Sequence, residues 1–247
     1  MKQIKIKNEH NENLIGVLHE ANNKKEIVII CHGFPGDKDE GFIKKFCENL
    51  QEADINAFRF DFSGFGESQG KIMSTTKRIS DLKKVVGYFN KKDFNVGLIG
   101  HSRGGTVSIL FSSKNKNIKF VICIAGEANT KKFLQKIFPH QRKQILKGKM
   151  FYYGSKRGKQ FPVTPATIKD LESYKPLNAV KYITCPILFV HGQEDISINP
   201  KASEDLYQKA NHPKKIKFYK NVDHNFSNPK DLEKMIKDCI KWIKGLK

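Results

Sequence analysis

The fold is decided by the stretch Val96-Gly97-Leu98-Ile99-Gly100-His101-Ser102-Arg103-Gly104-Gly105-Thr106. Its first four residues form an apolar run typical of a strand buried on both faces, and a helical pattern starts at Thr106. Ser102 lies between glycines at positions 100 and 104, which suit a tight strand-to-helix turn whose backbone is strained and whose hydroxyl must stay exposed. The stretch therefore predicts a nucleophilic serine at the carboxyl end of a buried strand.

Other short runs along the chain also predict strands, and helical segments alternate with the later ones. The two N-terminal runs show partial alternation of apolar and polar residues, which is typical of an antiparallel pair with one wet face. Most later runs are apolar throughout, as expected for parallel strands covered by helices. The predicted strands are residues 3–7, 14–20, 27–31, 57–60, 96–99, 120–125, 187–190 and 216–219, and the predicted helices are residues 42–52, 75–90, 106–113, 200–210 and 229–244. We expect one α/β domain over residues 1–247, with an eight-stranded, mostly parallel sheet and helices on both faces.

One long segment, residues 127–182, interrupts this alternation between the sixth and seventh strands. It contains a basic helical pattern over residues 131–147, and then two aromatic runs on either side of a Gly-Ser-Lys-Arg-Gly turn within residues 149–163. The second pattern predicts a hairpin. An insertion of this length at the carboxyl edge of a sheet is a candidate lid over the site.

A serine nucleophile needs a base and a group that orients the base, and at this kind of turn they follow in the order Ser, Asp or Glu, His. Asp195 follows the strand at residues 187–190, and His224 follows the strand at residues 216–219. Both lie where a parallel sheet builds its active site. Glu194 is an alternative orienting acid, and Asp223 is a weaker one because it adjoins the base.

The other histidines are less suited to act as the base. His101 follows the wrong strand, and two more begin His-Gly turns. Four lie in polar surroundings and are expected at the surface: His10, His19, His140 and His212. The predicted set is therefore Ser102, Asp195 and His224.

An oxyanion hole requires backbone N–H groups that point at the developing negative charge. Arg103, directly after the candidate nucleophile, supplies one. The second is expected from the loop Cys31-His32-Gly33-Phe34-Pro35-Gly36, where Phe34 is the natural donor because Pro35 has no N–H.

Taken together, these motifs resemble the α/β-hydrolase family over residues 27–244. The segments that carry the resemblance are His32-Gly33-Phe34, the turn from Asp61 to Ser68, Gly100 to Gly104, His191-Gly192 with Asp195, and Asp223-His224. The chain is most similar to small serine esterases of the feruloyl or cinnamoyl type and to acyl-peptidase-like hydrolases, which carry a short lid between the sixth and seventh strands. The resemblance implies a carboxylesterase that hydrolyses small-molecule esters through an acyl-enzyme on Ser102, without a cofactor. Arg103 stands where relatives often have a smaller or amide side chain, so the substrate stays open.

The sequence leaves two questions open: which reaction the site performs, and whether the aromatic residues of the hairpin contact substrate. The same three residues would serve a thioesterase, an acyl-peptidase or an acyltransferase, and the fold could also be a non-catalytic ligand-binding protein. In the hairpin, alternation would turn part of the aromatic side chains toward Ser102, so Phe151 and Tyr153 are candidate substrate contacts. The competing interpretation is that these rings only pack the insertion onto the body.

Composition limits the partners and the compartment. Lys and Arg number 45 against 25 Asp and Glu, a formal charge of +20, yet only five of the cations are Arg. Proteins that recognise nucleic-acid sequences depend on arginine, so we expect no specific nucleic-acid binding. Loose binding of polyanions is compatible with the net positive charge. The five scattered cysteines suggest a reducing compartment, and neither a metal-ligand cluster, a signal peptide nor a membrane span is apparent. We expect a cytoplasmic protein; a homo-oligomer is left open.

Overall fold

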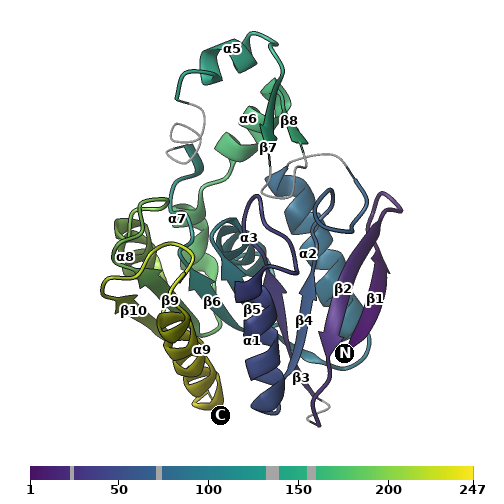
Figure 1. The fold of residues 1–247 in the computed structure, drawn as a ribbon, viewed down its shortest axis with the longest axis vertical. Helices are drawn as coiled ribbons and strands as arrows, with labels where there is room; N and C mark the ends of the chain where they lie inside the picture. Colours follow the sequence, from purple (N-terminus) through teal and green to yellow (C-terminus); the bar gives the residue numbers. More distant parts are fainter. Residues whose placement is uncertain (23–24, 71–73, 132–138, 155–159, 247) are drawn as a thin grey trace.

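A single eight-stranded sheet forms the centre of the computed structural model, which describes residues 1–22, 25–70, 74–131, 139–154 and 160–246 (Figure 1). Its strands are β1 (Lys2–Lys7), β2 (Asn13–His19), β3 (Glu26–Cys31), β4 (Asn56–Phe60), β5 (Asn95–His101), β6 (Ile118–Ile124), β9 (Ile187–Gly192) and β10 (Lys214–Tyr219). They lie in the order β1-β2-β4-β3-β5-β6-β9-β10. β2 pairs antiparallel with β1 and β4, and every other neighbouring pair is parallel. The predicted sheet is confirmed.

Helices cover both faces of the sheet. One face is covered by α1 (Gly41–Glu52) and α9 (Pro229–Lys244), and the other by α2 (Thr75–Asn90), α3 (Arg103–Ser112) and α8 (Lys201–Lys209). β3 shows how the sheet joins the two layers, because Ile27 and Ile29 pack with α2 and α3 while Val28 and Ile30 pack with α1 and α9. Each fully buried side chain of this size stabilises the fold by about 1.5–3 kcal/mol.

The insertion between β6 and β9 stands above the body of the molecule (Figure 1). Its described elements are α5 (Arg142–Leu146), the hairpin β7 (Phe151–Gly154) and β8 (Gln160–Val163), α6 (Pro165–Ser173), α7 (Pro176–Ala179) and the short 3-10 helix η1 (Val180–Tyr182). The predicted hairpin is confirmed. Its cationic tip, Lys156, Arg157 and Lys159, lies outside the described residues.

A carboxylate of the insertion ties it to helix α2. Asp170, in α6, accepts hydrogen bonds from the Thr75 backbone N–H at 2.5 Å and from the Ser74 hydroxyl at 3.1 Å. Both donors belong to the start of α2, where the N–H groups lack partners within the helix. Asp170 therefore caps α2 from outside and anchors the insertion to the body.

Two sequence expectations are wrong. The basic pattern over residues 131–147 is not one helix, since residues 139–141 form a turn before α5 begins, and Pro139 cannot continue a helix. His19 is fully buried rather than on the surface. Its Nε2 accepts a hydrogen bond from Nε of Arg59, 3.1 Å away on the neighbouring strand β4, and burial lowers the pKa of its imidazole.

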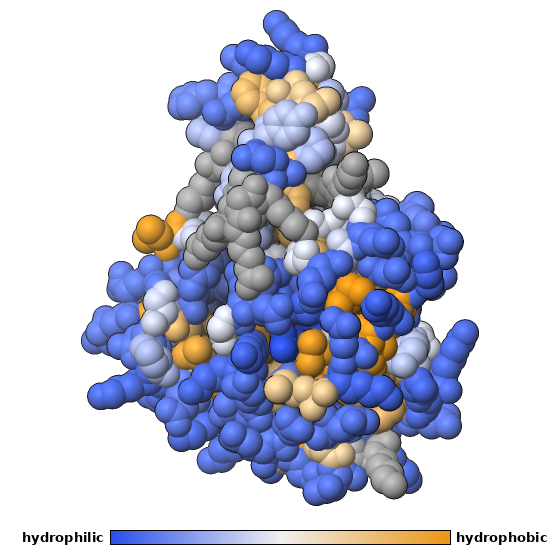
Figure 2. Space-filling model, turned by 45° about the vertical axis from the view of Figure 1, so that its right-hand side comes forward, coloured by the Kyte–Doolittle hydropathy of each residue, from blue (hydrophilic) through white to orange (hydrophobic). Residues whose placement is uncertain are grey.

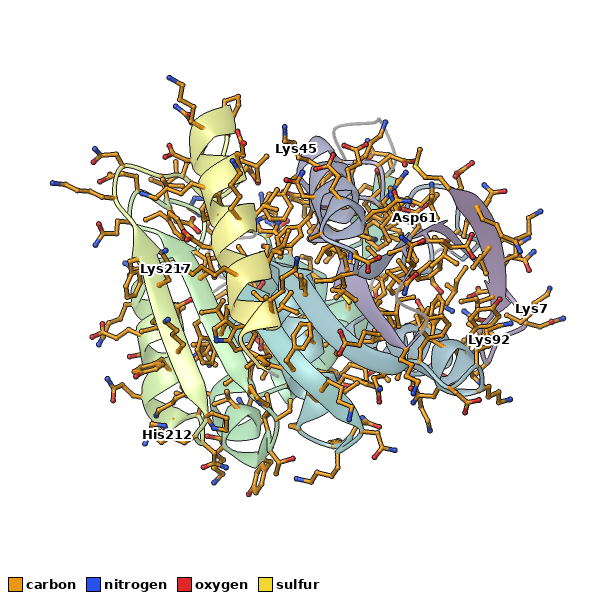
Figure 3. All side chains as sticks on the ribbon, turned by 90° about the horizontal axis from the view of Figure 1, so that it is seen from below. Lys7, Lys45, Asp61, Lys92, His212 and Lys217 are labelled. Atoms are coloured by element: carbon orange, nitrogen blue, oxygen red, sulfur yellow. The ribbon has the colours of Figure 1, made fainter. Side chains whose placement is uncertain are left out.

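Exposed lysines surround the body, whereas the acidic turn after β4 lies inside it. Lys45, Lys92 and Lys217 project outward in Figure 3, and Asp61 lies further in. The Asp61 carboxylate accepts a hydrogen bond from the Lys38 backbone N–H at 2.7 Å and forms an ion pair with Lys38 Nζ at 3.1 Å. The turn after β4 is thereby fixed to the loop after β3, where Phe34 lies.

Candidate active site

Ser102 occupies the sharp turn between β5 and α3. Its φ of 52° and ψ of −122° lie outside the regions that non-glycine residues prefer, and its backbone N–H donates to the Ile124 carbonyl at 2.7 Å. A Cβ on Gly100 or Gly104 would collide with backbone atoms, of Gly104 in the first case and of Cys31 in the second. The glycines let strand, turn and helix approach closely, which stabilises the strained backbone at Ser102.

The loop after β3 lies directly against this turn. A Cβ on Gly33 would be 3.3 Å from the Ser102 Cβ, a tight contact, so the glycine lets the loop approach the serine closely. Phe34 follows in the chain, and Arg103 is the first residue of α3. The two backbone N–H groups expected to form an oxyanion hole therefore come from segments on either side of Ser102.

Arg78, in α2, binds the loop after β3. Its guanidinium donates to the carbonyl of His32 at 3.3 Å and to that of Gly33 at 3.4 Å. It also lies over the rings of Phe62 and Phe65, with centroid distances of 4.7 and 4.4 Å. Burial lowers the pKa of Arg78 to about 9. The sequence pattern carries no sign of this role, because it depends on a contact between α2 and a loop some 45 residues earlier.

Asp195 and His224 come together at the carboxyl edge of the sheet. Asp195 Oδ2 lies 2.6 Å from His224 Nδ1, and Oδ1 accepts hydrogen bonds from the backbone N–H groups of Ser197 and Ile198 at 2.7 and 2.8 Å. Burial alone would raise the pKa of Asp195, but hydrogen bonds from His191 and His224 outweigh it and hold this pKa well below its usual range. The carboxylate is therefore ionised and accepts hydrogen bonds only, which places a proton on His224 Nδ1.

The rival acids do not take this position. Glu194 is exposed, and Asp223 accepts a hydrogen bond from the Ser227 backbone N–H at 2.9 Å. Neither has a hydrogen bond to His224 among the described residues.

His101, next to Ser102, holds the segment that carries His224. Its Nε2 lies 2.9 Å from the His224 carbonyl, which can only accept, and the two imidazole rings are 4.8 Å apart. Burial and the neighbouring imidazole of His224 lower the pKa of His101 to about 3, so the His101 ring is neutral near pH 7. On the other side of the segment, Gly192 touches the backbone of Val222 so closely that a Cβ would collide with it. These contacts bring the loop of His224 to the turn at Ser102.

A second histidine, His191, binds the same carboxylate oxygen as His224. Its Nε2 lies 2.9 Å from Asp195 Oδ2 and 3.0 Å from the carbonyl of Ile198. Both of these atoms accept, so Nε2 carries a proton, and Nδ1 lies 2.6 Å from the Ser203 hydroxyl. The sequence showed the His-Gly turn but gave no sign that the ring of His191 points back at Asp195.

The side chain of Arg103 is buried in an ion pair. Its Nη1 lies 2.9 Å from Oε2 of Glu127, the residue with which the insertion begins. Burial raises the pKa of Glu127 to about 6, although Arg103 opposes this shift, and burial lowers the pKa of Arg103. The unusual side chain after the serine thus anchors the start of α3 and does not project into solvent.

The aromatic residues of the hairpin meet the loop after β3. The ring of Tyr153 lies 5.0 Å from that of Phe34, and Phe161 lies 5.6 Å from it. Phe151 packs with Tyr153 on a small apolar cluster inside the insertion that includes Ile168. Of the two predicted substrate contacts, Tyr153 therefore touches Phe34 in the loop after β3, whereas Phe151 packs on the insertion's own apolar cluster.

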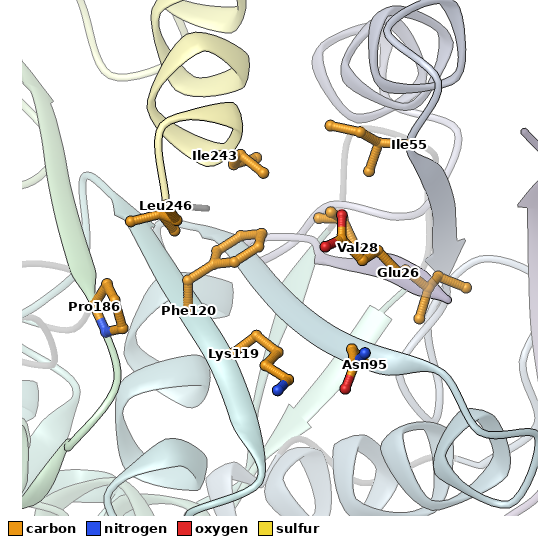
Figure 4. Close-up of a pocket in the computed structure, with 10 residues that line it drawn as sticks. Glu26, Val28, Ile55, Asn95, Lys119, Phe120, Pro186, Ile243 and Leu246 are labelled. Carbon is orange, nitrogen blue, oxygen red and sulfur yellow. The ribbon is translucent and has the colours of Figure 1, made fainter. Parts of the chain in front are cut away.

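Two pockets lie at opposite ends of the sheet. A pocket of about 930 Å³ is lined by residues that include Glu127, Asn178 and Asp195, at the edge that carries Ser102. A smaller pocket of about 360 Å³ lies at the start of β3 and β5, where Glu26 and Asn95 line it (Figure 4). Ligands of parallel α/β sheets bind at the carboxyl ends of the strands, so the larger pocket is the one that adjoins the candidate site.

Within the described ranges, no group of three or more His, Cys, Asp or Glu side chains is arranged to hold a metal ion. The same part of the chain has no helix with the length and apolar character of a membrane span.

Comparison with known proteins gives two overlapping family matches. The model described as serine aminopeptidase, S33, matches residues 22–152, and the model described as the BAAT / acyl-CoA thioester hydrolase C terminal matches residues 88–229. An Escherichia coli protein, the 31.7 kDa protein of the traX-finO intergenic region, is 24% identical over 226 residues, which cover 76% of this chain and 79% of that protein.

Solved structures resemble the whole chain. Est1E from Butyrivibrio proteoclasticus, with ferulic acid bound, superimposes with a TM-score of 0.81 at 21% identity and 98% coverage of both chains. The Pyrococcus furiosus esterase Pf2001 gives a TM-score of 0.75 at 20% identity, covering 98% of this chain and 91% of its own. At such identities these likenesses establish the fold.

Proposed function

Since the chain belongs to the α/β-hydrolase family, we propose that this hydrolase is a serine esterase that cleaves carboxylic esters of small molecules through Ser102, His224 and Asp195. The observation that carries the proposal is the 2.6 Å contact between Asp195 Oδ2 and His224 Nδ1, at the edge of the sheet where Ser102 stands in its strained turn. Esterases among the solved structures of this fold support ester cleavage as the reaction.

In the first half-reaction, His224 Nε2 takes the hydroxyl proton of Ser102 while Oγ attacks the ester carbonyl carbon. The carbonyl oxygen becomes an oxyanion, which the backbone N–H groups of Phe34 and Arg103 stabilise. The C–O bond to the alcohol then breaks, and His224 returns the proton to the departing alkoxide. The products of this half-reaction are the free alcohol and an acyl ester on Ser102.

In the second half-reaction, water takes the place of the serine hydroxyl as the attacking group. His224 removes its proton, the oxygen adds to the acyl carbon, and the bond to Ser102 Oγ breaks with return of the proton to Oγ. The acid is released and Ser102 is regenerated. Asp195 stays ionised throughout, keeps the His224 proton on Nδ1 and stabilises the imidazolium that forms in each step.

The described residues contain no hydrogen bond between Ser102 Oγ and the His224 ring, and such contacts commonly form only when substrate is bound. The alignment of His224 instead depends on the fixed neighbours of its loop. His101 holds its carbonyl, and Gly192 packs against the preceding backbone.

We also propose that residues 127–182 act as the lid. Tyr153 contacts Phe34, so a substrate whose carbonyl oxygen lies near the Phe34 N–H would have this ring beside it. Tyr153 and, less directly, Phe151 then contribute to the choice of acyl group. The large pocket between Glu127 and Asp195 offers room for the other part of the ester.

A thioester is the second candidate substrate class, because residues 88–229 match the acyl-CoA thioester hydrolase model. The chemistry would be the same, with a thiolate leaving in place of an alkoxide. Matched acyl esters and acyl thioesters of one chain length would rank the two.

The proposed function is tested with the wild-type protein and Ser102→Ala on an aryl acetate and with a fluorophosphonate label. We expect turnover by the wild type, a loss on the order of 10⁴-fold or more in kcat for the variant, and a label on Ser102. Equal thermal unfolding of the two proteins would show that the fold is intact. Activity retained in the variant, or a label on another residue, would overturn the assignment. Binding of esters without turnover would instead indicate a ligand-binding protein.

A further inference from the structure

The insertion carries an unusual charge. From Ala128 to Lys169 the sequence contains eleven Lys and Arg residues and no Asp or Glu. The acidic residues just beyond these limits are already engaged, because Glu127 is buried against Arg103 and Asp170 caps α2. Among the described residues of the insertion, only Glu172, which pairs with Arg142, compensates part of the positive charge of this stretch.

The outer surface of the insertion also exposes large apolar side chains. Leu146, Met150 and Tyr152 are 38%, 52% and 62% exposed, and they fall within seven consecutive residues. Only five other large apolar side chains are as exposed in the described part of the chain, and they are scattered. At the top of Figure 2, pale and orange surfaces of the insertion adjoin blue ones.

The hairpin geometry explains why these side chains face outward. Successive side chains of a strand point to opposite faces. Phe151 and Tyr153 turn inward to the apolar cluster of the insertion, and Tyr153 reaches Phe34. Tyr152, which lies between them in β7, turns outward, and Met150, directly before the strand, is also exposed. The inner face is already packed, so the outer apolar residues are not needed for the core of the insertion.

Lysines lie among the exposed apolar residues. Lys143, Lys147 and Lys149 are exposed, and no ion pair involves them among the described residues. The one described ion pair of this segment joins Arg142 to Glu172. Residues 143–152 thus form a surface with apolar and cationic side chains side by side, which we call the outer lid surface.

We propose that the outer lid surface docks on an anionic phospholipid surface. Such a surface offers negatively charged headgroups to the lysines and an apolar boundary to the apolar side chains. Tyr152, with an apolar ring and a polar hydroxyl, suits the boundary between the two, and lysine stems extend along it while their ammonium groups stay with the headgroups. Docking would place the outer face of the insertion against the lipid.

The same observations favour lipid over nucleic acid as the partner. Arg142 is the one arginine among the described residues of the insertion, and it is held by Glu172. Bidentate recognition of phosphates and base edges in nucleic acids favours the planar fork of arginine over lysine. Exposed Leu146 and Met150 have no counterpart in an electrostatic contact with a phosphate backbone, whereas they contribute directly to insertion below headgroups.

The test measures cosedimentation of the whole protein with vesicles of phosphatidylcholine, with and without phosphatidylglycerol. A protein of charge +20 adsorbs to any anionic surface, so the controls must separate the lid from the rest. Met150→Ser with Tyr152→Ser removes apolar side chains without changing the charge. Its matched control is Phe218→Ser with Leu246→Ser, which removes exposed apolar side chains outside residues 127–182.

A second pair of variants tests the charge. Lys143→Glu with Lys147→Glu acts on the outer lid surface, and Lys2→Glu with Lys5→Glu changes the total charge equally on β1. We expect both lid variants to weaken binding to anionic vesicles by about tenfold or more, and their matched controls to weaken it far less. Binding should fall as salt rises from ~50 to ~500 mM.

Equal losses in the lid variants and their controls would overturn the proposal, since binding would then reflect total charge alone. Unchanged binding in the Met150 and Tyr152 variant would overturn it as well. Stronger binding to a duplex DNA than to anionic vesicles, lost in the lid charge variant, would assign the surface to nucleic acid instead. Because the readout is binding, the result is independent of whether the protein hydrolyses esters.

Discussion

Replacing His191 with Leu tests how the carboxylate of Asp195 is held. The substitution removes the Nε2–H donor 2.9 Å from Asp195 Oδ2, at a site where both side chains are fully buried. Asp195 keeps His224 and two backbone N–H groups as donors. A hydrogen bond to a charged group is worth about 1.5–3 kcal/mol, so we expect the pKa of Asp195 to rise toward its ordinary value and kcat/KM to fall about 10- to 100-fold.

The pH profile distinguishes this effect from a merely structural one. With one donor fewer, Asp195 takes up a proton at higher pH than in the wild type, and a protonated Asp195 no longer stabilises the imidazolium of His224. The acid limb of kcat/KM should therefore move to higher pH, by about half to one unit. Two other titratable groups face His224: His101, which is neutral near pH 7, and Glu127, whose pKa of about 6 lies within the range of the assay. Glu127 and its ion pair with Arg103 are the same in the wild type and in the variants, so its contribution to the profile is common to all of them.

The assay is kcat/KM for an aryl ester from acid to neutral pH. Ser203→Ala is the matched control, because it removes the hydroxyl next to His191 Nδ1 but keeps the ring. We expect a smaller shift in the same direction for this control. A folded Leu variant whose profile keeps the height and position of the wild type would refute the reasoning, as would a shift toward lower pH.

Three further variants are expected to behave differently from one another. Asp195→Asn should lower kcat by on the order of 10⁴-fold and Glu194→Gln by far less, measured on the same aryl ester; the reverse ranking would move the role to Glu194. Arg78→Gln should lower kcat about tenfold or more with little change in KM and weaken a boronic-acid inhibitor, because the loop before Phe34 loses its support; a change in KM alone would contradict this. Tyr153→Ala should lower kcat/KM for bulky or aromatic acyl esters by about 1–3 kcal/mol more than for acetates, and equal effects on both would show that its ring only packs the lid.

The sheet could be predicted from the sequence because each strand has a local signal, a short apolar or alternating run of residues. The apolar run before Gly100 and the glycines around Ser102 specify a strand, a turn and a helix without help from the rest of the chain. The order of Asp195 and His224 after two later strands then follows from topology, since parallel strands end at the same edge.

The supporting residues could not be predicted in the same way. His191, His101 and Arg78 act through contacts with atoms distant in sequence, and no periodicity reveals which carbonyl or carboxylate a buried ring will meet. His19 was placed at the surface because its neighbours in sequence are polar, whereas its burial depends on Arg59 of another strand.

Helix α6 is a different case, because its signal was present. Thr164 accepts from the Thr167 backbone N–H, and Pro165 takes the first helical position, which together mark a helix start. The basic pattern upstream instead predicts a helix over residues 131–147, and this prediction is wrong because residues 139–141, which begin with Pro139, form a turn.

The cap that Asp170 provides for α2 contributes to the free energy that opening of the proposed lid would require. Lifting of the proposed lid would exchange Asp170 for water at the Thr75 N–H, at a cost on the order of 1–2 kcal/mol for the cap. The contacts of Tyr153 and Phe161 with Phe34 would add to this cost. The Ser74 hydroxyl oxygen would still accept from the Lys77 N–H, so α2 would keep its first turn, and Arg78 would keep its contact with the loop after β3. The proposed lid could then open while the residues of the candidate site stay assembled.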